Sequence, residues 1–317
     1  MTVVVIGDVN VDLQLVLPTT IDGRGEHAHP DPVLTGGGSA ANAAAALARL
    51  GVETRFVGMV GNDTYGAEAV RSLLDAGVDT ASIQTSAGGM TVMVLVVVPA
   101  DGDRLIYVWP PRGGAHVELA VDAAAAGVLD ASWVHVSGIA LRGEPAAASI
   151  LEVMAGARSA GVPVSLDVNL RLENWGWESG FRDTITAAIE RSDVVLGGAV
   201  DEICPLVGSD DPRRAVAELA AGGRTVVGRL GAEGAIAHDG DRSFSAGGFD
   251  VEVVDTVGAG DAFDAGFIAA QLRGEPLDRA LHYANGVAAL AIGRHGARST
   301  PGHDLVMRLV DGDRPTV

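Results

Sequence analysis

The chain has 317 residues, 48% of them hydrophobic, which is enough for one large α/β domain or two small ones. Its net charge of −19 is spread along the sequence, which argues against nucleic acids or anionic membranes as partners and favours a soluble cytoplasmic protein. The single cysteine, Cys204, excludes an internal disulfide and is expected to be a small core residue.

Lysine is absent from the chain, since all 22 basic residues are arginines. The sequence therefore excludes enzymes that depend on a P-loop lysine, a protein-kinase lysine, a Schiff-base lysine or a pyridoxal lysine. No apolar run approaches the ~18 residues of a membrane span. At the N-terminus, no charged region precedes an apolar one in the manner of a secretory signal.

Strands and helices are expected to alternate along most of the chain. A buried strand opens the sequence, and a Gly-rich turn then leads into a helix that ends at Gly51. Further strands are predicted at 55–61, 132–140, 163–171, 193–198, 224–231 and 249–254, and further helices at 64–78, 147–162, 184–192, 213–223 and from 259 onward. This alternation predicts an α/β fold, a doubly wound and mostly parallel sheet with helices on both faces. Ligands of such sheets bind beyond the carboxyl ends of the strands.

Two stretches, at about 11–34 and 90–112, break the alternation because they contain strands without intervening helices. The second stretch includes "TVMVLVVVPADGDRLIYVW", which is typical of a hairpin around "ADGD". We expect the two stretches to form a small antiparallel sheet. This sheet would project as a discontinuous β-lid from a single domain that spans 1–317.

The stretch "DTVGAGDAFDAGF", residues 255–267, places two glycines and an acid at the start of a helix. A helix N-terminus favours anions, and glycines let the backbone approach them closely. The N–H groups of Gly258, Ala259 and Gly260 are therefore candidates for an anion hole around a phosphoryl group. Asp261 beside them is a candidate general base toward a hydroxyl nucleophile. The alternative is that Asp261 only caps the helix and the glycines only form a turn.

This stretch resembles the C-terminal signature of the ribokinase-like (PfkB) carbohydrate kinases, and "GGSAANAAAALARLG" resembles their N-terminal signature. The resemblance covers nearly the whole chain, because "GDVNVD", "DVNLR", "RLGAEGA" and "ANGVAALAIGRHGARSTP" follow in the family's order. It implies a ribokinase-like fold and an ATP-dependent kinase that uses Mg²⁺ and phosphorylates an alcohol of a sugar or nucleoside. It also implies that Asp261 is the catalytic base and that residues 258–260 form the anion hole.

The resemblance implies two groups of substrate-binding residues. Asn10 and Asp12 match positions that bind substrate hydroxyls, and their alternate spacing in a strand lets both side chains face one ligand. Gly37, Gly38 and Asn42 match the other wall of the site. The alternatives are a solvated edge residue for Asp12 and a helix-start residue for Asn42.

The resemblance also assigns nucleotide and cation positions. Gly231, Gly234 and Asn285 match positions that line the adenine and ribose, although Asn285 is equally typical of a satisfied core amide. A loop around "GRHGARST" resembles the site of a monovalent cation such as K⁺ in some members. The residues implied for this cation are Asp255, Val257 and Thr300.

One position departs from the family pattern. Members usually carry Asn-x-x-Glu after the "DVVL" strand, and this motif is tied to Mg²⁺ and phosphate. Here the segment reads "AVDE", so Ala199 replaces the Asn while Glu202 remains. Because Mg²⁺ keeps several of its waters, we expect Glu202 to act on it through a water molecule, with Asp201 as a further contributor.

The acceptor alcohol is left open by the sequence. Tyr107 and Trp109 offer flat apolar faces to a sugar ring or nucleobase, and lid-core packing explains them equally well. Trp109 stands where an arginine would suit a sugar acid, although Arg112 follows nearby. Arg171 resembles a phosphate- or substrate-contacting arginine, with a surface ion pair as its alternative.

We expect the substrate to be a small neutral sugar such as ribose or fructose. The alternatives are a nucleoside kinase of the adenosine or pseudouridine type and a sugar-acid kinase. A non-catalytic sensor of sugar or nucleotide is the alternative from a different class of protein. An exposed lid edge also favours a homodimer that forms through the lid.

Overall fold

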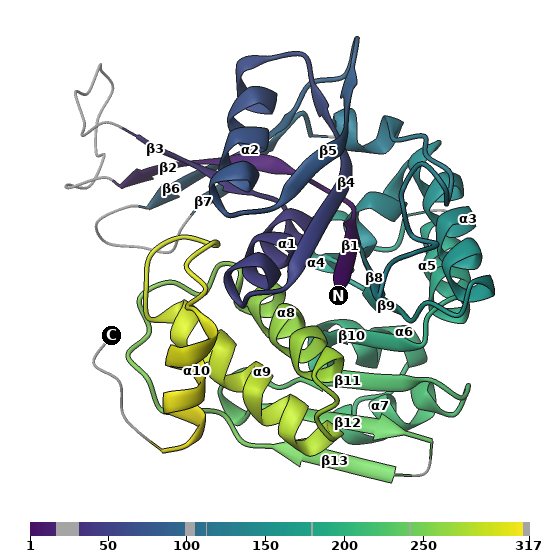
Figure 1. Ribbon diagram of the computed structural model, residues 1–317, viewed down its shortest axis with the longest axis vertical. Coiled ribbons are helices and arrows are strands. Elements are labelled where there is room, and N and C mark those ends of the chain that lie inside the picture. The colour runs from purple at the N-terminus through teal and green to yellow at the C-terminus, as the bar shows by residue number, and fades with distance from the viewer. Residues whose placement is uncertain (17–31, 99–104, 112, 179, 241, 313–317) are drawn as a thin grey trace.

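A nine-stranded sheet forms the centre of the structure, a computed structural model that describes residues 1–16, 32–98, 105–111, 113–178, 180–240 and 242–312 (Figure 1). The strand order is β13-β12-β11-β10-β9-β8-β1-β4-β5. Neighbours from β11 to β5 are parallel, while β12 and β13 add an antiparallel hairpin at one edge. The strands are β1 (Thr2–Ile6), β4 (Glu53–Gly61), β5 (Asp79–Ser86), β8 (Trp133–Ser137), β9 (Val164–Asp167), β10 (Val194–Gly198), β11 (Thr225–Arg229), β12 (Ala235–Asp239) and β13 (Arg242–Ala246).

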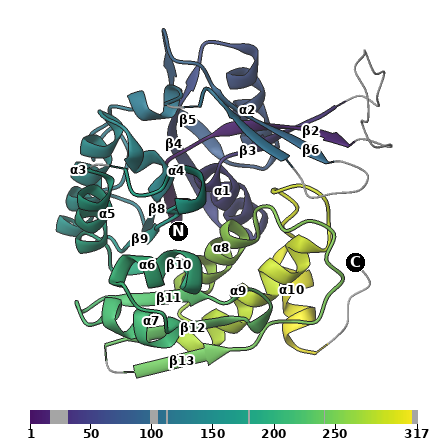
Figure 2. The same ribbon diagram turned by 180° about the vertical axis from the view of Figure 1, so that it is seen from behind.

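Buried side chains of the sheet alternate between two hydrophobic cores, one on each face. In β1, Val3 and Val5 pack into one core and Val4 and Ile6 into the other, as the two-residue period of a strand requires. Helices cover both faces (Figures 1 and 2), which confirms the predicted doubly wound fold. The first face carries α1 (Ser39–Arg49), α2 (Thr64–Asp75), α8 (Ala259–Leu272), α9 (Leu277–Ile292) and α10 (His303–Val310). The second face carries α3 (Ala146–Ser159), α5 (Phe181–Glu190), α6 (Cys204–Val207) and α7 (Pro212–Ala220).

A second, smaller sheet extends away from this body (Figure 1). Its order is β3-β2-β6-β7, from β2 (Asn10–Val16), β3 (Val33–Gly37), β6 (Val92–Val98) and β7 (Leu105–Trp109). The expectation of a purely antiparallel sheet is wrong, because β2 and β6 leave the body side by side and pair in parallel. The predicted antiparallel pairing of β6 with β7 is confirmed. The "ADGD" tip and residues 17–31 lie outside the described residues.

The strand expected at 249–254 is also absent, since this described segment has no regular structure. The end of this segment forms hydrogen bonds with a helix and not with a strand, because the N–H groups of Val254 and Asp255 donate to the carbonyl of Ile292 at the end of α9. The β12–β13 hairpin forms the sheet edge instead. Cys204 is buried in the second core, as expected. None of the helices in the described ranges is long and apolar enough to cross a bilayer.

Candidate active site

A cavity of about 490 Å³ lies between the smaller sheet β3-β2-β6-β7, which we call the lid sheet, and the carboxyl ends of the central strands. This is where a doubly wound sheet is expected to bind a ligand, and the size is in the range of small-molecule sites. The polar residues that line it include Asp8, Asn10, Asp12, Asn42, Arg171 and Asp261. The lid adds an apolar wall of Val92, Val94, Val96, Ile106 and Val108.

The first turn of α8 meets this cavity at Gly258 and Asp261. Gly258 has a φ of 80°, and a Cβ there would lie 2.5 Å from a backbone carbonyl oxygen, so only glycine fits. The N–H of Ala259 donates to the carbonyl of Thr256 at 3.3 Å, whereas those of Gly258 and Gly260 have no acceptor among the described residues. Two free N–H groups at a helix N-terminus are suited to an anion.

The Asp261 carboxyl group is only 7% exposed, and its Oδ2 accepts a hydrogen bond from Nδ2 of Asn42 at 2.9 Å. Burial raises the pKa of Asp261 to about 7, against the lowering effects of the Asn42 hydrogen bond and the charge of Arg171. No described residue donates a hydrogen bond to Oδ1. A carboxylate with a pKa near neutrality and one free oxygen is well matched to accept a proton from an alcohol.

The predicted substrate wall is formed by two strands of the lid sheet. Asn10 Nδ2 donates to Asp12 Oδ1 at 2.7 Å, and both side chains line the cavity. Burial raises the pKa of Asp12 to about 6. Gly38 lines the cavity, whereas Gly37 lies behind the pair, where a Cβ would stand 2.5 Å from Asp12 Oδ1. The glycine at 37 therefore makes room for the polar pair and does not itself line the cavity.

Asp8 is a cavity residue that the motif comparison did not single out. Its Oδ2 accepts from the N–H of Ser39 at 2.7 Å and its Oδ1 from that of Ala40 at 3.3 Å. A carboxylate there satisfies free N–H groups and complements the helix dipole, so it fixes the start of α1, the helix that carries Asn42. The sequence did contain a signal for Asp8, because this acidic residue stands directly between a buried apolar strand and the start of a more polar one.

The assignment of Tyr107 and Trp109 to the substrate wall needs correction. Both side chains are more than half exposed, and neither lines the cavity. Because side chains alternate along β7, the inward positions are Ile106 and Val108 instead. The lid wall is therefore aliphatic and offers no aromatic face to a ligand. Arg112 lies outside the described residues.

Two arginines, Arg142 and Arg171, line the cavity. The guanidinium of Arg142 is already occupied by contacts within the protein. It donates to the carbonyl of Leu170, pairs with Glu178 at 3.3 Å and stacks on Phe181 at 3.9 Å. The guanidinium of Arg171 has no hydrogen-bond or ion-pair partner among the described residues. Its φ of 47° is rare for a side-chain-bearing residue, and such strain gathers at functional sites.

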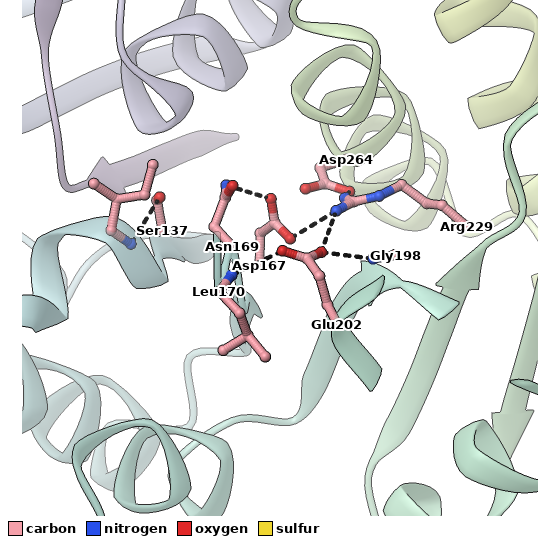
Figure 3. A network of polar contacts seen from close by, with 9 residues as sticks. Ser137, Asp167, Asn169, Leu170, Gly198, Glu202, Arg229 and Asp264 are labelled. Carbon is pink, nitrogen blue, oxygen red and sulfur yellow. Dashed lines mark hydrogen bonds and ion pairs between the residues drawn. The ribbon is translucent and has the colours of Figure 1, made fainter. Parts of the chain in front are cut away.

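A buried ionic cluster was unforeseen from the sequence, and Figure 3 shows its charged side chains, those of Asp167, Glu202, Arg229 and Asp264. The guanidinium of Arg229 donates to Asp264 at 2.6 Å, to Asp167 at 2.9 Å and to Glu202 at 3.4 Å. Burial raises the pKa of both Asp264 and Glu202. A Cβ on Gly260 would lie 3.3 Å from Arg229 Cζ, so the cluster packs directly against the backbone of Gly260 in the first turn of α8.

Glu202, the expected Mg²⁺ residue, belongs to this cluster. Its Oε1 accepts from the N–H of Leu170 at 2.8 Å and its Oε2 from that of Gly198 at 2.7 Å (Figure 3). Ala199 is fully buried in the core, and Asp201 is exposed. No group of three or more His, Cys, Asp or Glu side chains that could hold a metal ion occurs within the described ranges. These side chains do not fit a direct Mg²⁺ cage.

The three expected nucleotide residues gather around the backbone that follows β13. Gly231 and Gly234 adopt φ angles of 61° and 95° in the turn between β11 and β12. A Cβ on Gly234 would lie 2.1 Å from the carbonyl oxygen of Ala246. Asn285 on α9 donates to the carbonyls of Ala246 and Gly247, both at 3.1 Å. The NH₂ group of Asn285 thus supports this segment, and contact of Asn285 with a nucleotide stays a prediction.

The residues expected around a monovalent cation join the segments that precede α8 and follow α9. Asp255 accepts from the N–H of Val257 through Oδ1 and from that of Gly296 through Oδ2, both at 3.1 Å. Val257 lines the cavity, while Thr300 is buried. Cation binding by these residues stays a prediction.

A basic carboxylate beside free helix N–H groups, at the floor of a lidded cavity, is the equipment of a phosphotransferase with an alcohol acceptor. Residues 1–303 match the model of the pfkB family carbohydrate kinases. The chain therefore belongs to the pfkB family of carbohydrate kinases. It is an ATP-dependent carbohydrate kinase, as the motifs predicted.

Similar proteins include both curated relatives and solved structures. The ATP-dependent ribose-1-phosphate kinase of Halopiger xanaduensis is 36% identical over 305 residues, which is 95% of each chain. The Escherichia coli protein crystallised as ribokinase II with ATP and Mg²⁺ superposes with a TM-score of 0.84 at 26% identity, covering 98% of this chain and 99% of that one. Fructokinase of Vibrio cholerae, bound to fructose, ADP and potassium ion, gives 0.80 at 27% identity and covers 98% of each chain.

Proposed function

We propose that this kinase moves the γ-phosphoryl group of ATP to a hydroxyl of a sugar held in the 490 Å³ cavity. The observation that carries the proposal is the position of Asp261 in the first turn of α8: it lines the cavity, no described residue donates to its Oδ1, and the N–H groups of Gly258 and Gly260 in the same turn have no acceptor among the described residues. The hydroxyl oxygen attacks the γ-phosphorus while its proton passes to the Asp261 carboxylate. The bond from the γ-phosphorus to the oxygen that bridges it to the β-phosphate breaks, and ADP leaves.

The anion hole would stabilise the negative charge on the phosphoryl oxygens during the transfer. The N–H groups of Gly258 and Gly260 and the dipole of α8 are already oriented, so no reorganisation is needed at the moment of transfer. Asn10 and Asp12 would bind other hydroxyls of the sugar and set which one faces Asp261. The aliphatic lid wall would exclude water from the transferred group.

Within the sugar class, we propose a ribose phosphorylated at C1 as the first candidate substrate. Arg171 is the supporting observation, because it lines the cavity and its guanidinium has no hydrogen-bond or ion-pair partner among the described residues. A guanidinium in that state suits a substrate phosphate. The ribose-1-phosphate kinase that is 36% identical to this chain acts on such a sugar.

A neutral sugar is the second candidate. The carboxylates of Asp12 and Asp261 line the same cavity and favour hydroxyl groups over further negative charge. The fructokinase structure with bound fructose supports this candidate as well.

The nucleotide and ions follow from the same relatives. ATP would lie outside the lid cavity, with its terminal phosphate at the start of α8 and its nucleoside near Gly231, Gly234 and Asn285. Mg²⁺ would arrive with the nucleotide phosphates, since the described side chains form no cage of their own. Asp255, Val257 and Thr300 would hold K⁺. The acidic surface charge of the chain suits a cytoplasmic location.

The testing experiment is ADP release coupled to a detection enzyme, with Mg²⁺ and with or without K⁺. The acceptors are ribose 1-phosphate, ribose, fructose, a sugar acid and several nucleosides. We expect the highest kcat/KM with ribose 1-phosphate. A higher value with ribose or fructose would move the assignment to a neutral sugar. Binding of a sugar without ADP release from any acceptor would contradict the kinase and favour a sensor.

A further inference from the structure

Arg298, in the segment between α9 and α10, lies behind the wall of the cavity and is not among the residues that line it. Its three nitrogens each donate to a different element. Nε donates to Oδ1 of Asn42 on α1 at 3.1 Å, and Nη1 donates to Oγ of Ser72 on α2 at 2.6 Å. Nη2 donates to the carbonyl of Gly37 at the end of β3, at 2.9 Å. One guanidinium therefore ties together two helices and a lid strand.

The hydrogen bond from Arg298 decides the orientation of the Asn42 amide. A guanidinium has donors only, so the amide must turn its oxygen toward Arg298. Its NH₂ group then faces the other way, where Nδ2 donates to Oδ2 of Asp261 at 2.9 Å. A flipped amide would set NH₂ against the guanidinium and its oxygen against a carboxylate, which loses both bonds. The amide thus has one orientation, and in it Asp261 is the acceptor.

We propose that Arg298 is a positioning residue for the phosphoryl transfer, and that it holds the Asp261 carboxylate through the amide of Asn42. This inference rests on the proposed role of Asp261 as the base. With Oδ2 bound to the amide, Oδ1 is the oxygen directed to the substrate. The bond to the Gly37 carbonyl lets the same guanidinium fix the backbone behind Asp12 and Asn10. Arg298 therefore sets the base and the substrate wall relative to each other.

The charge of Arg298 provides a second, separable contribution. A cation near Asp261 favours its ionised form, as does the hydrogen bond from Asn42. The other charged groups that act on this carboxyl come from the loop after β1, the end of β9, the residue before the short helix α4 (Leu172–Trp175) and the next turn of α8. These groups are Asp8, Asp167, Arg171 and Asp264. Three of the four are acidic, so loss of Arg298 leaves Asp261 harder to ionise.

A double-mutant cycle tests whether Arg298 acts through Asn42. The kcat/KM of Arg298→Met, Asn42→Ala and the double variant is measured with the best acceptor of the panel. We expect each single change to lower kcat/KM by about tenfold, as loss of orientation does at such sites. The double variant should lose clearly less than the product of the two single losses, because the path from Arg298 to the base through Asn42 is already broken, and only the charge of Arg298 and its bond to the Gly37 carbonyl still add a loss of their own. Losses that multiply in the double variant would overturn the proposal.

The pH profile separates positioning from a merely structural role. Each single variant should shift the acid limb of kcat/KM upward, since the base has lost a hydrogen bond or a charge that favours its ionised form. Arg298→Lys keeps the charge without the three-way fork, so we expect it to lose activity as well. A wild-type rate and profile for Arg298→Lys would show that charge alone suffices and would contradict the proposal.

The control is Arg49→Met, which removes a neighbouring positive charge that makes no bond to Asn42. It should leave kcat/KM and the pH profile unchanged. Thermal melting and ATP binding identify any variant that is unfolded. If Arg298→Met is unfolded, the test is made with Arg298→Lys. Asp261→Asn separates the two levels of the proposal. If that variant is active, the base assignment fails; if it is inactive while the Arg298 variants match wild type, only the positioning role fails.

Discussion

The floor of the cavity and its lid wall are built in different ways. At the floor, Asp261 is 7% exposed and hydrogen-bonded to Asn42, and a buried ionic cluster packs beneath the neighbouring glycine. The lid wall consists of aliphatic side chains on strands of a small sheet, such as Ile106 and Val108 on β7. The contacts at the floor are buried hydrogen bonds and ion pairs, which depend on direction, whereas those of the lid wall are apolar contacts, which do not.

This difference suggests how the two regions divide the work. Hydrogen bonds and charges at the floor fix atoms to within the distances that proton and phosphoryl transfer require. Aliphatic contacts on the lid wall close over a ligand and exclude water, and they discriminate weakly between ligands of similar shape. We therefore expect changes at the floor to affect kcat, and changes on the lid wall to affect mainly KM.

The largest effect is expected from Asp261→Asn, which removes the base and keeps the shape of the side chain. Without a proton acceptor, turnover should fall by ~10²-fold or more, as for general bases elsewhere. Steady-state kinetics with the coupled ADP assay measures it. Turnover near that of the unaltered enzyme would show that Asp261 is not an essential base.

Arg229→Met is expected to act on stability. It leaves Asp167, Glu202 and Asp264 without the cation they share, and breaking a buried ion pair from one side costs about 3–5 kcal/mol of unfolding free energy. Urea denaturation measures the loss. Arg242→Met is the matched control, because that arginine is exposed on β13 and should change stability little. Equal midpoints for the two variants would contradict a structural role of the cluster.

Arg171→Met is expected to separate the two candidate substrates. If Arg171 binds a substrate phosphate, the KM for ribose 1-phosphate should rise by about tenfold, the loss of one charge-assisted hydrogen bond. The KM for ribose should stay unchanged. Arg213, exposed on α7 and remote from the cavity, provides the control variant Arg213→Met. A parallel rise for both sugars would point to a general structural role of Arg171.

Two adjacent residues on opposite faces of β7, Val108 and Tyr107, allow a matched test of the lid wall. Val108→Asn places a polar group on the inner wall and should raise the sugar KM by a few-fold, about 1 kcal/mol. Tyr107→Asn changes an outward side chain that is 58% exposed, so the kinetics should not change. If the outer face forms the expected homodimer, Tyr107→Asn should lower the mass measured by light scattering from two chains to one. A mass of one chain for the unaltered protein would reject the dimer.

Sequence patterns predicted which side chains share a cavity where the contacts are local, while the roles of these side chains stay predictions. Asp261 and its glycines are adjacent in the chain, and Asn10 and Asp12 share a strand face by simple alternation. Sequence patterns failed where long-range register decides. Whether Tyr107 or Val108 faces inward depends on the phase of β7 in the lid sheet, which its own residues do not reveal.

The buried polar network was missed for a related reason. The partner of Arg298 lies 256 positions away on α1, and Asp264 lies 35 positions from Arg229. A usable signal was present, because Asp264 is a charged residue in an otherwise apolar stretch of α8 and must have a partner when buried. Which partner it has could be known only from the fold.

The most direct test of the central claim, that Asp261 is the base, is the pH dependence of kcat/KM for the unaltered enzyme. The ionised carboxylate is the active form, and burial raises its pKa to about 7. We predict that kcat/KM rises with pH through about 7 and then reaches a plateau, after correction for the titration of the nucleotide. A profile that stays flat between about pH 5.5 and 8.5 would contradict the account, because the carboxyl would then not titrate where the structure requires.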